Sequence, residues 1–401
     1  MKFLRKQIDG VKHHFEKGGK WAKFYYMFEA LETFLFVPDS VASAKGTHVR
    51  DAIDMKRLMI TVIIAMVPCL LFGIYNVGYQ QYLATGTGSS FGEMIATGLI
   101  KVLPIVVVSY GVGLGIEFIF TIFRKHPVNE GFLVTGLLIP LVMPPDIPLW
   151  QVGLATAFSV VIGKEAFGGT GMNILNVALT ARAFLYFAYP GDISGEVWTY
   201  LPQGVETVAG YSGATPLSLA AQTVSSGNNV VASLNSFGTG WADGLYEFSN
   251  LFFGFIPGCV GETSVLMCLI GALILVLTGV GSGKIMFSVF GGAYLMGFVM
   301  NLLAVNEYMA MPPHYHLVIG GLAFGAVFMA TDPVTAAQTE RGKWIYGFLI
   351  GVLTVIIRVF NPVYPEGIML AILLMNVFAP LIDYYVVKAN KKRRLQRAAT
   401  I

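Results

Sequence analysis

The sequence predicts an all-α polytopic membrane protein with about ten transmembrane helices. Of its 401 residues, 55% are hydrophobic and only 12% are charged, whereas a soluble domain usually carries about 25% charged residues. The mean hydropathy of +0.67 and the 29 phenylalanines support the same class. The net charge is +3, and the charged residues are distributed along the chain as membrane topology requires. The charge therefore does not indicate a nucleic-acid partner.

Ten apolar segments are candidates for spans, because a helix needs roughly 20 apolar residues to cross the bilayer. Four of them are continuous, at 58–76, 102–123, 263–281 and 285–306. Six are interrupted by Pro, Gly or single charges, at 131–145, 149–163, 174–189, 317–331, 344–357 and 367–387.

The basic residues orient these spans. Eleven of the 26 Lys and Arg lie in 1–57 and six lie in 388–397. The positive-inside rule therefore places both ends in the cytoplasm, which requires an even number of spans. No Lys or Arg occurs in 183–283, so the central loop is expected outside the cytoplasm. Lys101 and Arg358 fall on the outer side and are exceptions to the rule.

Five regions follow from this topology. We expect a cytoplasmic or interfacial segment at 1–56, a first membrane half at 57–190, an extracytoplasmic loop at 191–250, a second half at 251–387 and a basic cytoplasmic tail at 388–401. The cysteines Cys69, Cys259 and Cys268 form no CxxC pair. Three cysteines are too few to bind an iron–sulfur cluster, which needs about four thiolates. We therefore expect them to be buried membrane cysteines.

The two halves are predicted to be inverted repeats. The sequence LIPLVMPPD at 138–146 and the sequence FGAVFMATD at 324–332 are both apolar and end in Met-x-x-Asp. The first span runs outward and the second inward. Transporters often place a pathway at the axis between such repeats. Asp146 would then lie at one mouth and Asp332 at the other.

Apolar side chains between these mouths are candidates for a dewetted constriction. Ordinary helix packing is the alternative for all of them. They are Val134, Leu137, Leu141, Phe324 and Phe328.

Carboxylates within or at the ends of spans are functional candidates. The four that stand out are Glu117, Asp146, Asp332 and Asp383. The alternative for each is a helix-end charge in the headgroup layer. Three of them, Glu117, Asp332 and Asp383, are expected at the cytoplasmic side.

The segment 21–36 is predicted to form an amphipathic helix, because Phe24, Phe28, Leu31 and Leu35 share one face. One interpretation is an interfacial helix. The alternative is that the helix forms a wall of a site for a hydrophobic ligand, with Phe28 on that wall.

The stretch GYSGATPLS at 210–218 lies in the outer loop. Thr215 precedes Pro216, and Thr before a Pro at the first helical position predicts a helix N-cap. A helix N-terminus also suits a phosphate, so an anion site is the alternative.

Several motifs together identify a family. Besides SGAT at 212–215, the chain has THVRD at 47–51, RKHPVNEGF at 124–132, KEAFGGTGMN at 164–173, MATDP at 329–333 and NPVYPEG at 361–367. Nearly the whole chain resembles the NqrB/RnfD family, whose members are membrane subunits of the Na+-translocating NADH:quinone reductase and of the Rnf complex. The N-terminal extension favours the quinone reductase branch.

The resemblance implies a covalent FMN. The last residue of the motif Ser212-Gly213-Ala214-Thr215 would carry it as a phosphoester installed by an extracytoplasmic flavin transferase. The family motif often has an Asp six residues before this Thr, where the chain has Ala209. An ester at Thr215 would keep the oxygen acceptor of the cap and lose the proton.

The resemblance also implies a non-covalent riboflavin. Asn173 and Asn176, one helical turn apart, would face its ring, and Gly169 would allow close approach. Arg182 lies in an apolar span and needs a partner, either this flavin or a nearby carboxylate. Acidic residues matching Glu117, Asp332 and Asp383 are associated with Na+ uptake in the family. Three carboxylates are too many for one monovalent ion, so the resemblance implies an entry funnel and not a single cage. Gly113 lies in a patch that influences the family's quinone site.

The function implied is that of a flavin-carrying subunit of a respiratory Na+ pump in the bacterial inner membrane, which passes electrons from FMN through riboflavin to quinone. The chain has no dinucleotide-binding fingerprint, so NADH oxidation is expected in a partner flavoprotein with an iron–sulfur centre. A second FMN-bearing subunit and small membrane subunits are the other expected partners. The rival functions are the Rnf role and a flavin-free inverted-repeat channel or transporter.

Overall fold

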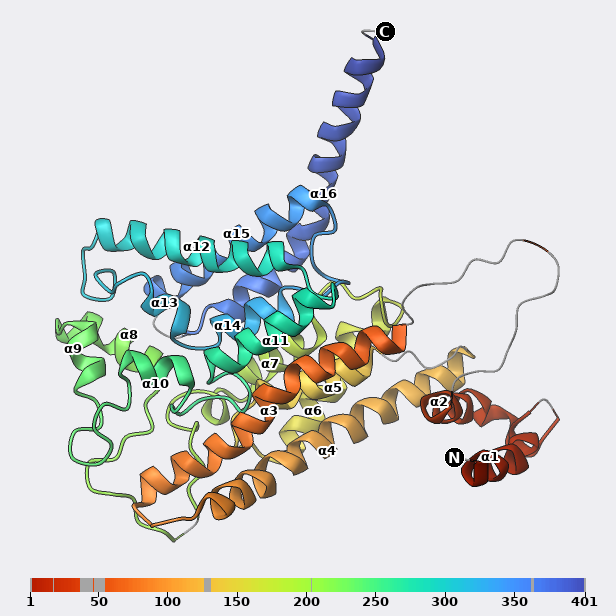
Figure 1. Cartoon of the computed structure of the whole chain (residues 1–401), viewed down its shortest axis with the longest axis horizontal. Helices are drawn as coiled ribbons and strands as arrows, with labels where there is room; N and C mark the ends of the chain where they lie inside the picture. Colours follow the sequence, from red (N-terminus) through yellow and green to blue (C-terminus); the bar gives the residue numbers. More distant parts are fainter. Residues whose placement is uncertain are drawn as a thin grey trace.

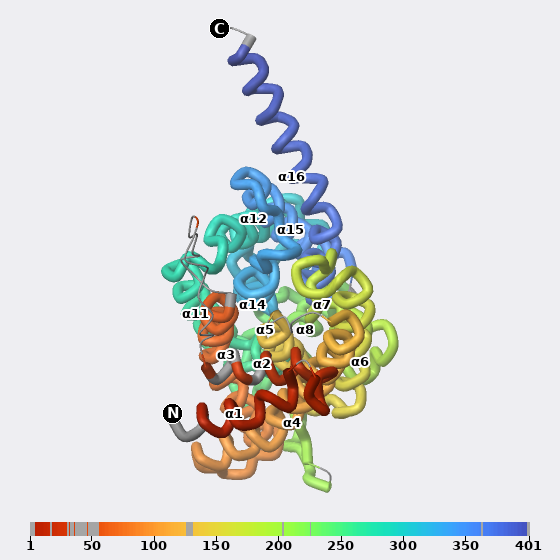
Figure 2. Tube along the Cα trace, turned by 90° about the vertical axis from the view of Figure 1, so that its right-hand side faces the viewer, coloured from red at the N-terminus to blue at the C-terminus, as the bar shows by residue number. Residues whose placement is uncertain are grey.

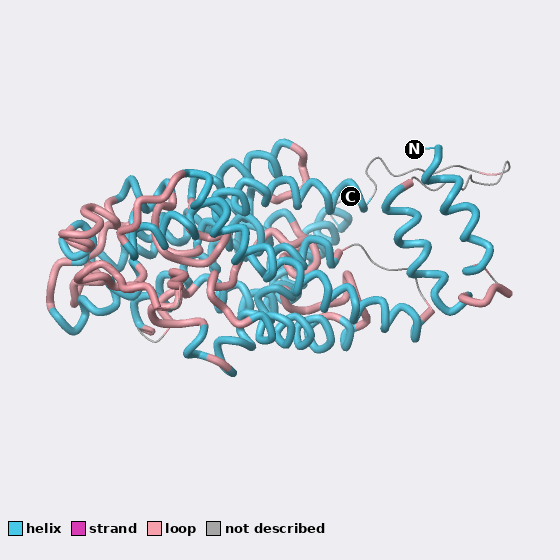
Figure 3. The backbone as a smooth tube through the Cα atoms, turned by 90° about the horizontal axis from the view of Figure 1, so that it is seen from below, coloured by secondary structure: helices cyan, strands magenta, loops and turns pink. Residues whose placement is uncertain are grey.

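The computed structural model describes residues 2–16, 18–36, 46, 55–125, 131–202, 204–361 and 364–399. Throughout these ranges all regular structure is helical, which confirms the all-α class (Figure 3). Five of the described helices are long and apolar enough to cross a membrane. They are α3 (Met55–Thr85), α4 (Phe91–Arg124), α12 (Gly283–Leu302), α15 (Glu340–Phe360) and α16 (Ile368–Ala399).

The other predicted spans contain shorter helices. Four of these are single helices, namely α5 (Phe132–Leu141), α6 (Leu149–Gly163), α7 (Val177–Ala188) and α11 (Val265–Leu277). Helix α6 begins directly after Pro148 and ends at Gly163, because Pro suits a helix start and Gly weakens the helix.

The apolar run 317–331 does not form one helix. It is divided into α13 (Tyr315–Val318), α14 (Leu322–Phe324) and a π-helical turn (Gly325–Met329). The break falls at Gly320, whose φ of +69° is a left-handed conformation that favours glycine. The sequence predicts one span here that is interrupted by glycine, and hydropathy does not show where the helix breaks.

The two halves share a pattern of helix contacts. In the first half α4 packs against α6 and α6 against α7; in the second half α12 packs against α15 and α15 against α16. Helices α3 and α11 join the halves (Figure 1). The buried thiols of Cys69 and Cys268 meet at this junction, 3.9 Å apart.

The two basic exceptions to the charge rule are satisfied locally. Lys101 forms an ion pair with Asp146 at 3.0 Å and lies over the ring of Tyr200. The side chain of Arg358 is fully buried and donates to the carbonyl oxygens of His316 and Ile319. Neither residue therefore acts as a free surface charge.

The loop region lies at one end of the bundle. It holds η3 (Pro190–Asp192), α8 (Pro216–Ser226), α9 (Val230–Asn235) and α10 (Phe248–Phe253), opposite the N-terminal helices (Figures 1 and 3). These N-terminal helices are α1 (Lys2–Phe15), η1 (Ala22–Phe24) and α2 (Tyr25–Leu35). The last turns of α16 extend away from the bundle (Figures 1 and 2).

Some predicted features fall outside the described residues. These are the whole motif at 47–51 and the central parts of the motifs at 124–132 and 361–367.

Two adjacent glycines on α12 allow a matched test of close helix packing. A Cβ added at Gly292 would lie 2.3 Å from the carbonyl oxygen of Phe348 on α15, whereas a Cβ at Gly291 would meet nothing within 4 Å. We expect Gly292→Ala to destabilise the fold by about 1–3 kcal/mol, because overpacking forces the backbones apart. Gly291→Ala should be neutral or stabilising by up to about 1 kcal/mol. Thermal unfolding of the two detergent-solubilised variants measures the difference, and equal melting temperatures would contradict the packing.

Candidate functional site

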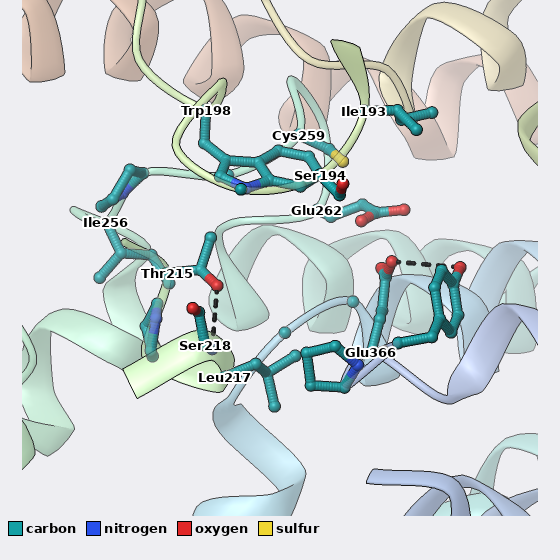
Figure 4. A pocket seen from close by; sticks show the side chains of 18 of the residues that line it. Ile193, Ser194, Trp198, Thr215, Leu217, Ser218, Ile256, Cys259, Glu262 and Glu366 are labelled. Atoms are coloured by element: carbon teal, nitrogen blue, oxygen red, sulfur yellow. Dashed lines mark hydrogen bonds between the residues drawn. The ribbon is translucent and has the colours of Figure 1, made fainter. Parts of the chain in front are cut away.

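A cavity of about 510 Å³ lies beside Thr215 at the end of the bundle that carries the loop region. Thr215 and Ser218 line one side of it, and Trp198, Cys259 and Glu262 line another (Figure 4). Cavities of roughly 300–1,000 Å³ are typical of small-molecule and cofactor sites. The volume therefore suits a group as large as a flavin.

Thr215 caps a helix, as its sequence context predicts. Its Oγ1 accepts a hydrogen bond from the backbone N–H of Ser218 at 3.2 Å, and Pro216 is the first residue of α8. The cap uses the oxygen as an acceptor and does not need the hydroxyl proton. The residue is half-buried and lines the cavity.

The segment before Thr215 is held from both sides. Ser212 donates to the carboxylate of Glu196 at 3.1 Å, and Tyr246 donates to the carbonyl oxygen of Ala214. A Cβ at Gly213 would lie 2.9 Å from the carbonyl oxygen of Glu196. The segment is thus fixed before α8 begins, and Gly213 is needed for the close approach.

A buried ion-pair cluster forms another wall of the cavity. Arg182 on α7 lies with its Nη1 3.2 and 3.3 Å from the two carboxylate oxygens of Glu262, and its Nη2 donates to Glu366. The same Nη1 lies 3.0 Å from the sulfur of Cys259. The partner predicted for Arg182 from the sequence was either a flavin or a nearby carboxylate, and the structure shows two carboxylates.

Asn173 and Asn176 do not lie on a helix, so the prediction that they are one helical turn apart is wrong. Gly168, Gly169 and Gly171 all adopt positive φ, and the chain turns repeatedly before α7 begins. Asn176 is the N-cap of α7, where it accepts from the N–H of Leu179 at 3.2 Å.

A second, smaller cavity nevertheless brings the two asparagines together. Its volume is about 100 Å³, and Lys164, Asp332 and Phe328 line it as well. This volume is well below the usual range for a cofactor site. The cavity as it stands does not accommodate a flavin ring. Arg182 lines the larger cavity and not this one.

The four predicted carboxylates have different surroundings. Glu117 is buried and forms an ion pair with Lys164. Asp332 accepts from Thr335 Oγ1 at 3.0 Å and faces the smaller cavity. Asp383 accepts from the backbone N–H groups of Gln338 and Thr339 just before α15, as a helix-end charge would. Asp146 pairs with Lys101.

The apolar residues predicted for a constriction are packed in the bundle. Val134 and Phe328 line the smaller cavity, whereas Leu137, Leu141 and Phe324 are buried in the core. The rings of Phe324 and Phe328 are 5.0 Å apart across the π-helical turn.

The two residues predicted near a quinone lie on neighbouring helices, because α2 contacts α4. Phe28 on α2 stacks on Phe15 of α1 with ring centroids 4.6 Å apart. Gly113 on α4 is buried, and the ring of Phe132 occupies the space that a Cβ would take. The glycine therefore serves the packing of α5 on α4.

The comparisons with known proteins cover nearly the whole chain. Residues 42–392 match the model of the NQR2, RnfD, RnfE family. The chain belongs to this family. It is 46% identical to NqrB, a subunit of the Na(+)-translocating NADH-quinone reductase, from Chromohalobacter salexigens, over 99% of this chain and 97% of that protein. It is 47% identical to the protein of the same name from Ectopseudomonas mendocina, over 98% and 99%.

Three site residues of this family member were missed by the sequence analysis. They are Trp198, Glu262 and Glu366, which all line the larger cavity. The signal for the two glutamates was Arg182 in an apolar span, because a guanidinium there needs acceptors such as carboxylates or backbone carbonyls. Their sequence separations from Arg182 left the choice among several acids open. Nothing in the sequence marks Trp198 among the five tryptophans.

The ion pairs of Arg182 and Lys101 provide a prediction about stability. Arg182→Met leaves two buried carboxylates without a cation, and we expect a loss of about 3–5 kcal/mol. Lys101→Met breaks a more exposed pair, and we expect a loss of no more than about 1 kcal/mol. Thermal unfolding in detergent compares the two variants, and an Arg182→Met protein as stable as Lys101→Met would contradict the role of the cluster.

Proposed function

We propose that this chain is the flavin-carrying membrane subunit of a Na+-translocating NADH-quinone reductase. The support is the full-length similarity to relatives that bear this name, together with a flavin-sized cavity that contains Thr215. The relatives are matched along the N-terminal region too, which favours the quinone reductase over the Rnf complex. NADH oxidation and the remaining redox centres belong to partner subunits.

FMN is proposed to be held through a phosphoester at the hydroxyl of Thr215, and it supplies one-electron redox chemistry there. The half-buried hydroxyl lines the cavity at the N-terminus of an 11-residue helix, where the helix dipole favours a phosphate. Trp198 offers an aromatic surface within the same cavity. The flavin transferase would act on this segment from outside the cytoplasm.

The proposed topology keeps both termini in the cytoplasm of a bacterial inner membrane. The loop region that contains α8 then faces the outside. The helix contacts shared by the two halves support a repeat, as does the Met-x-x-Asp sequence at or just after the end of a short helical segment in each half. In this arrangement Asp146 and Asp332 mark the two ends of the Na+ pathway, with Val134 and Phe328 near the inner end.

Quinone is proposed to bind where α2 meets α4, at the end of the bundle opposite Thr215. Phe28 and the exposed side chains of Trp21 and Phe24 provide the apolar surface.

The uptake of Na+ is a separate question. Glu117 is engaged in an ion pair, and Asp383 accepts hydrogen bonds from the backbone just before α15. A funnel for Na+ uptake would therefore have to begin at Asp332.

A fluorescent gel tests the covalent flavin. Protein made together with a flavin transferase should give a band under ultraviolet light after denaturing electrophoresis, and Thr215→Ala should abolish it. Ser218→Ala removes the neighbouring hydroxyl in the same cavity and should keep the band. A wild-type protein without fluorescence would overturn the flavoprotein proposal and favour a flavin-free transporter.

Riboflavin near Asn173 stays a prediction, because the smaller cavity is too small for it as it stands. We expect flavin that is released by denaturation, in addition to the covalent flavin. Asn173→Leu should lose it. Asn250→Leu should keep it, since Asn250 is also a half-buried asparagine with one local backbone bond. Quantifying released flavin by chromatography measures both, and equal amounts in wild type and Asn173→Leu would place the second flavin elsewhere.

A further inference from the structure

The larger cavity has an unusual charged wall. Arg182, Glu262 and Glu366 all line it, and their side chains are only 4%, 6% and 14% exposed. Charges that are shielded from water act strongly on a bound group, because the effective dielectric constant is low. The charges of this wall therefore affect the free energy of any bound group that gains or loses charge in the cavity.

The carboxylates outnumber the cations on this wall. Both of them share the single guanidinium of Arg182. Arg358 is a second buried cation, which does not line the cavity and donates its hydrogen bonds to the backbone carbonyls of His316, Ile319 and Glu366. Both oxygens of Glu262 lie within ion-pair distance of one nitrogen of Arg182, at 3.2 and 3.3 Å from Nη1.

The wall is close to the attachment point. A Cβ at Gly320 would lie 2.5 Å from Leu217, two residues after Thr215, and a Cβ at Gly321 would lie 2.9 Å from Glu262 and 3.0 Å from Glu366. The glycine pair thus lies between the start of α8 and the two carboxylates. A group held at Thr215 in this cavity has the carboxylates on its opposite side.

We propose that the buried carboxylates of this wall, Glu262 above all, hold the reduction potential of the flavin at Thr215 below the value it would have without them. The inference rests on the proposed function of Thr215. A flavin that accepts an electron becomes more negative, and a fixed carboxylate nearby disfavours that change. Charges near the flavin ring are a recognised means by which a protein tunes its electronics.

Glu262 is the better residue to change. The Glu366 segment is also fixed by Arg358 through its backbone carbonyl, and Tyr364 Oη lies 3.5 Å from its carboxylate. Glu262→Gln keeps the shape of the side chain and an oxygen that can accept from Arg182, while it removes the charge.

The experiment is a redox titration of the purified chain with covalent flavin, followed by its visible absorbance. In Glu262→Gln we expect at least about a tenfold higher ratio of reduced to oxidised flavin at a fixed potential, which is a positive shift of about 59 mV for one electron. Glu165→Gln removes a buried carboxylate that pairs with Arg124 and does not line the cavity, and the flavin potential of this control variant should stay unchanged.

A variant that adds a negative charge to the cavity provides a second test, because misfolding alone would not shift the potential in opposite directions in the two variants. Ser194 lines the same cavity and is half-buried, so Ser194→Asp should shift the potential in the negative direction. If Glu262→Gln and Ser194→Asp carry the fluorescent band and titrate like the wild type, the inference is wrong while the attachment at Thr215 stands. If the wild type carries no band, both proposals fall together.

Discussion

The burial of Arg182 is the constraint on which the site depends. A guanidinium inside an apolar bundle needs carboxylates or backbone carbonyls to accept its hydrogen bonds, and Arg182 has two carboxylates. Its carboxylates come from the second half of the chain, at Glu262 before α11 and Glu366 before α16. The cluster therefore ties α7 of the first half to two helix starts of the second. Both carboxylates lie on non-helical backbone just before these helices, and this backbone lines the cavity.

The irregular backbone is hydrogen-bonded, as a membrane protein requires. The N–H groups of Val260 and Gly261 donate to the carbonyl oxygens of Met143 and Leu141, at 3.1 and 2.7 Å. The carbonyl of Val142 accepts from Arg182. The C-terminal end of the short helix α5 is thus satisfied by a loop of the opposite half. Short, broken helices and a polar cavity are two results of the same arrangement.

Local features were predicted well from the sequence, and features that join distant segments were not. Apolar runs located the helices, and Thr215 with Pro216 located the start of α8, since both depend on neighbouring residues. The break at Gly320 and the turns at 168–171 were missed, because hydropathy does not register a positive φ. Trp198 and the two glutamates meet Thr215 only through the fold, so the motif alone could not indicate them.

The geometry resolves the conflict between the two roles of Thr215. The helix cap needs only a lone pair on Oγ1, which accepts from Ser218 N–H. A phosphoester replaces the hydroxyl proton and leaves a lone pair on the bridging oxygen. An added phosphate would be an anion at the positive end of α8, where the helix dipole would stabilise it. A residue that begins a helix beside a cavity is therefore suited to carry the ester, and modification there does not require the helix to unwind.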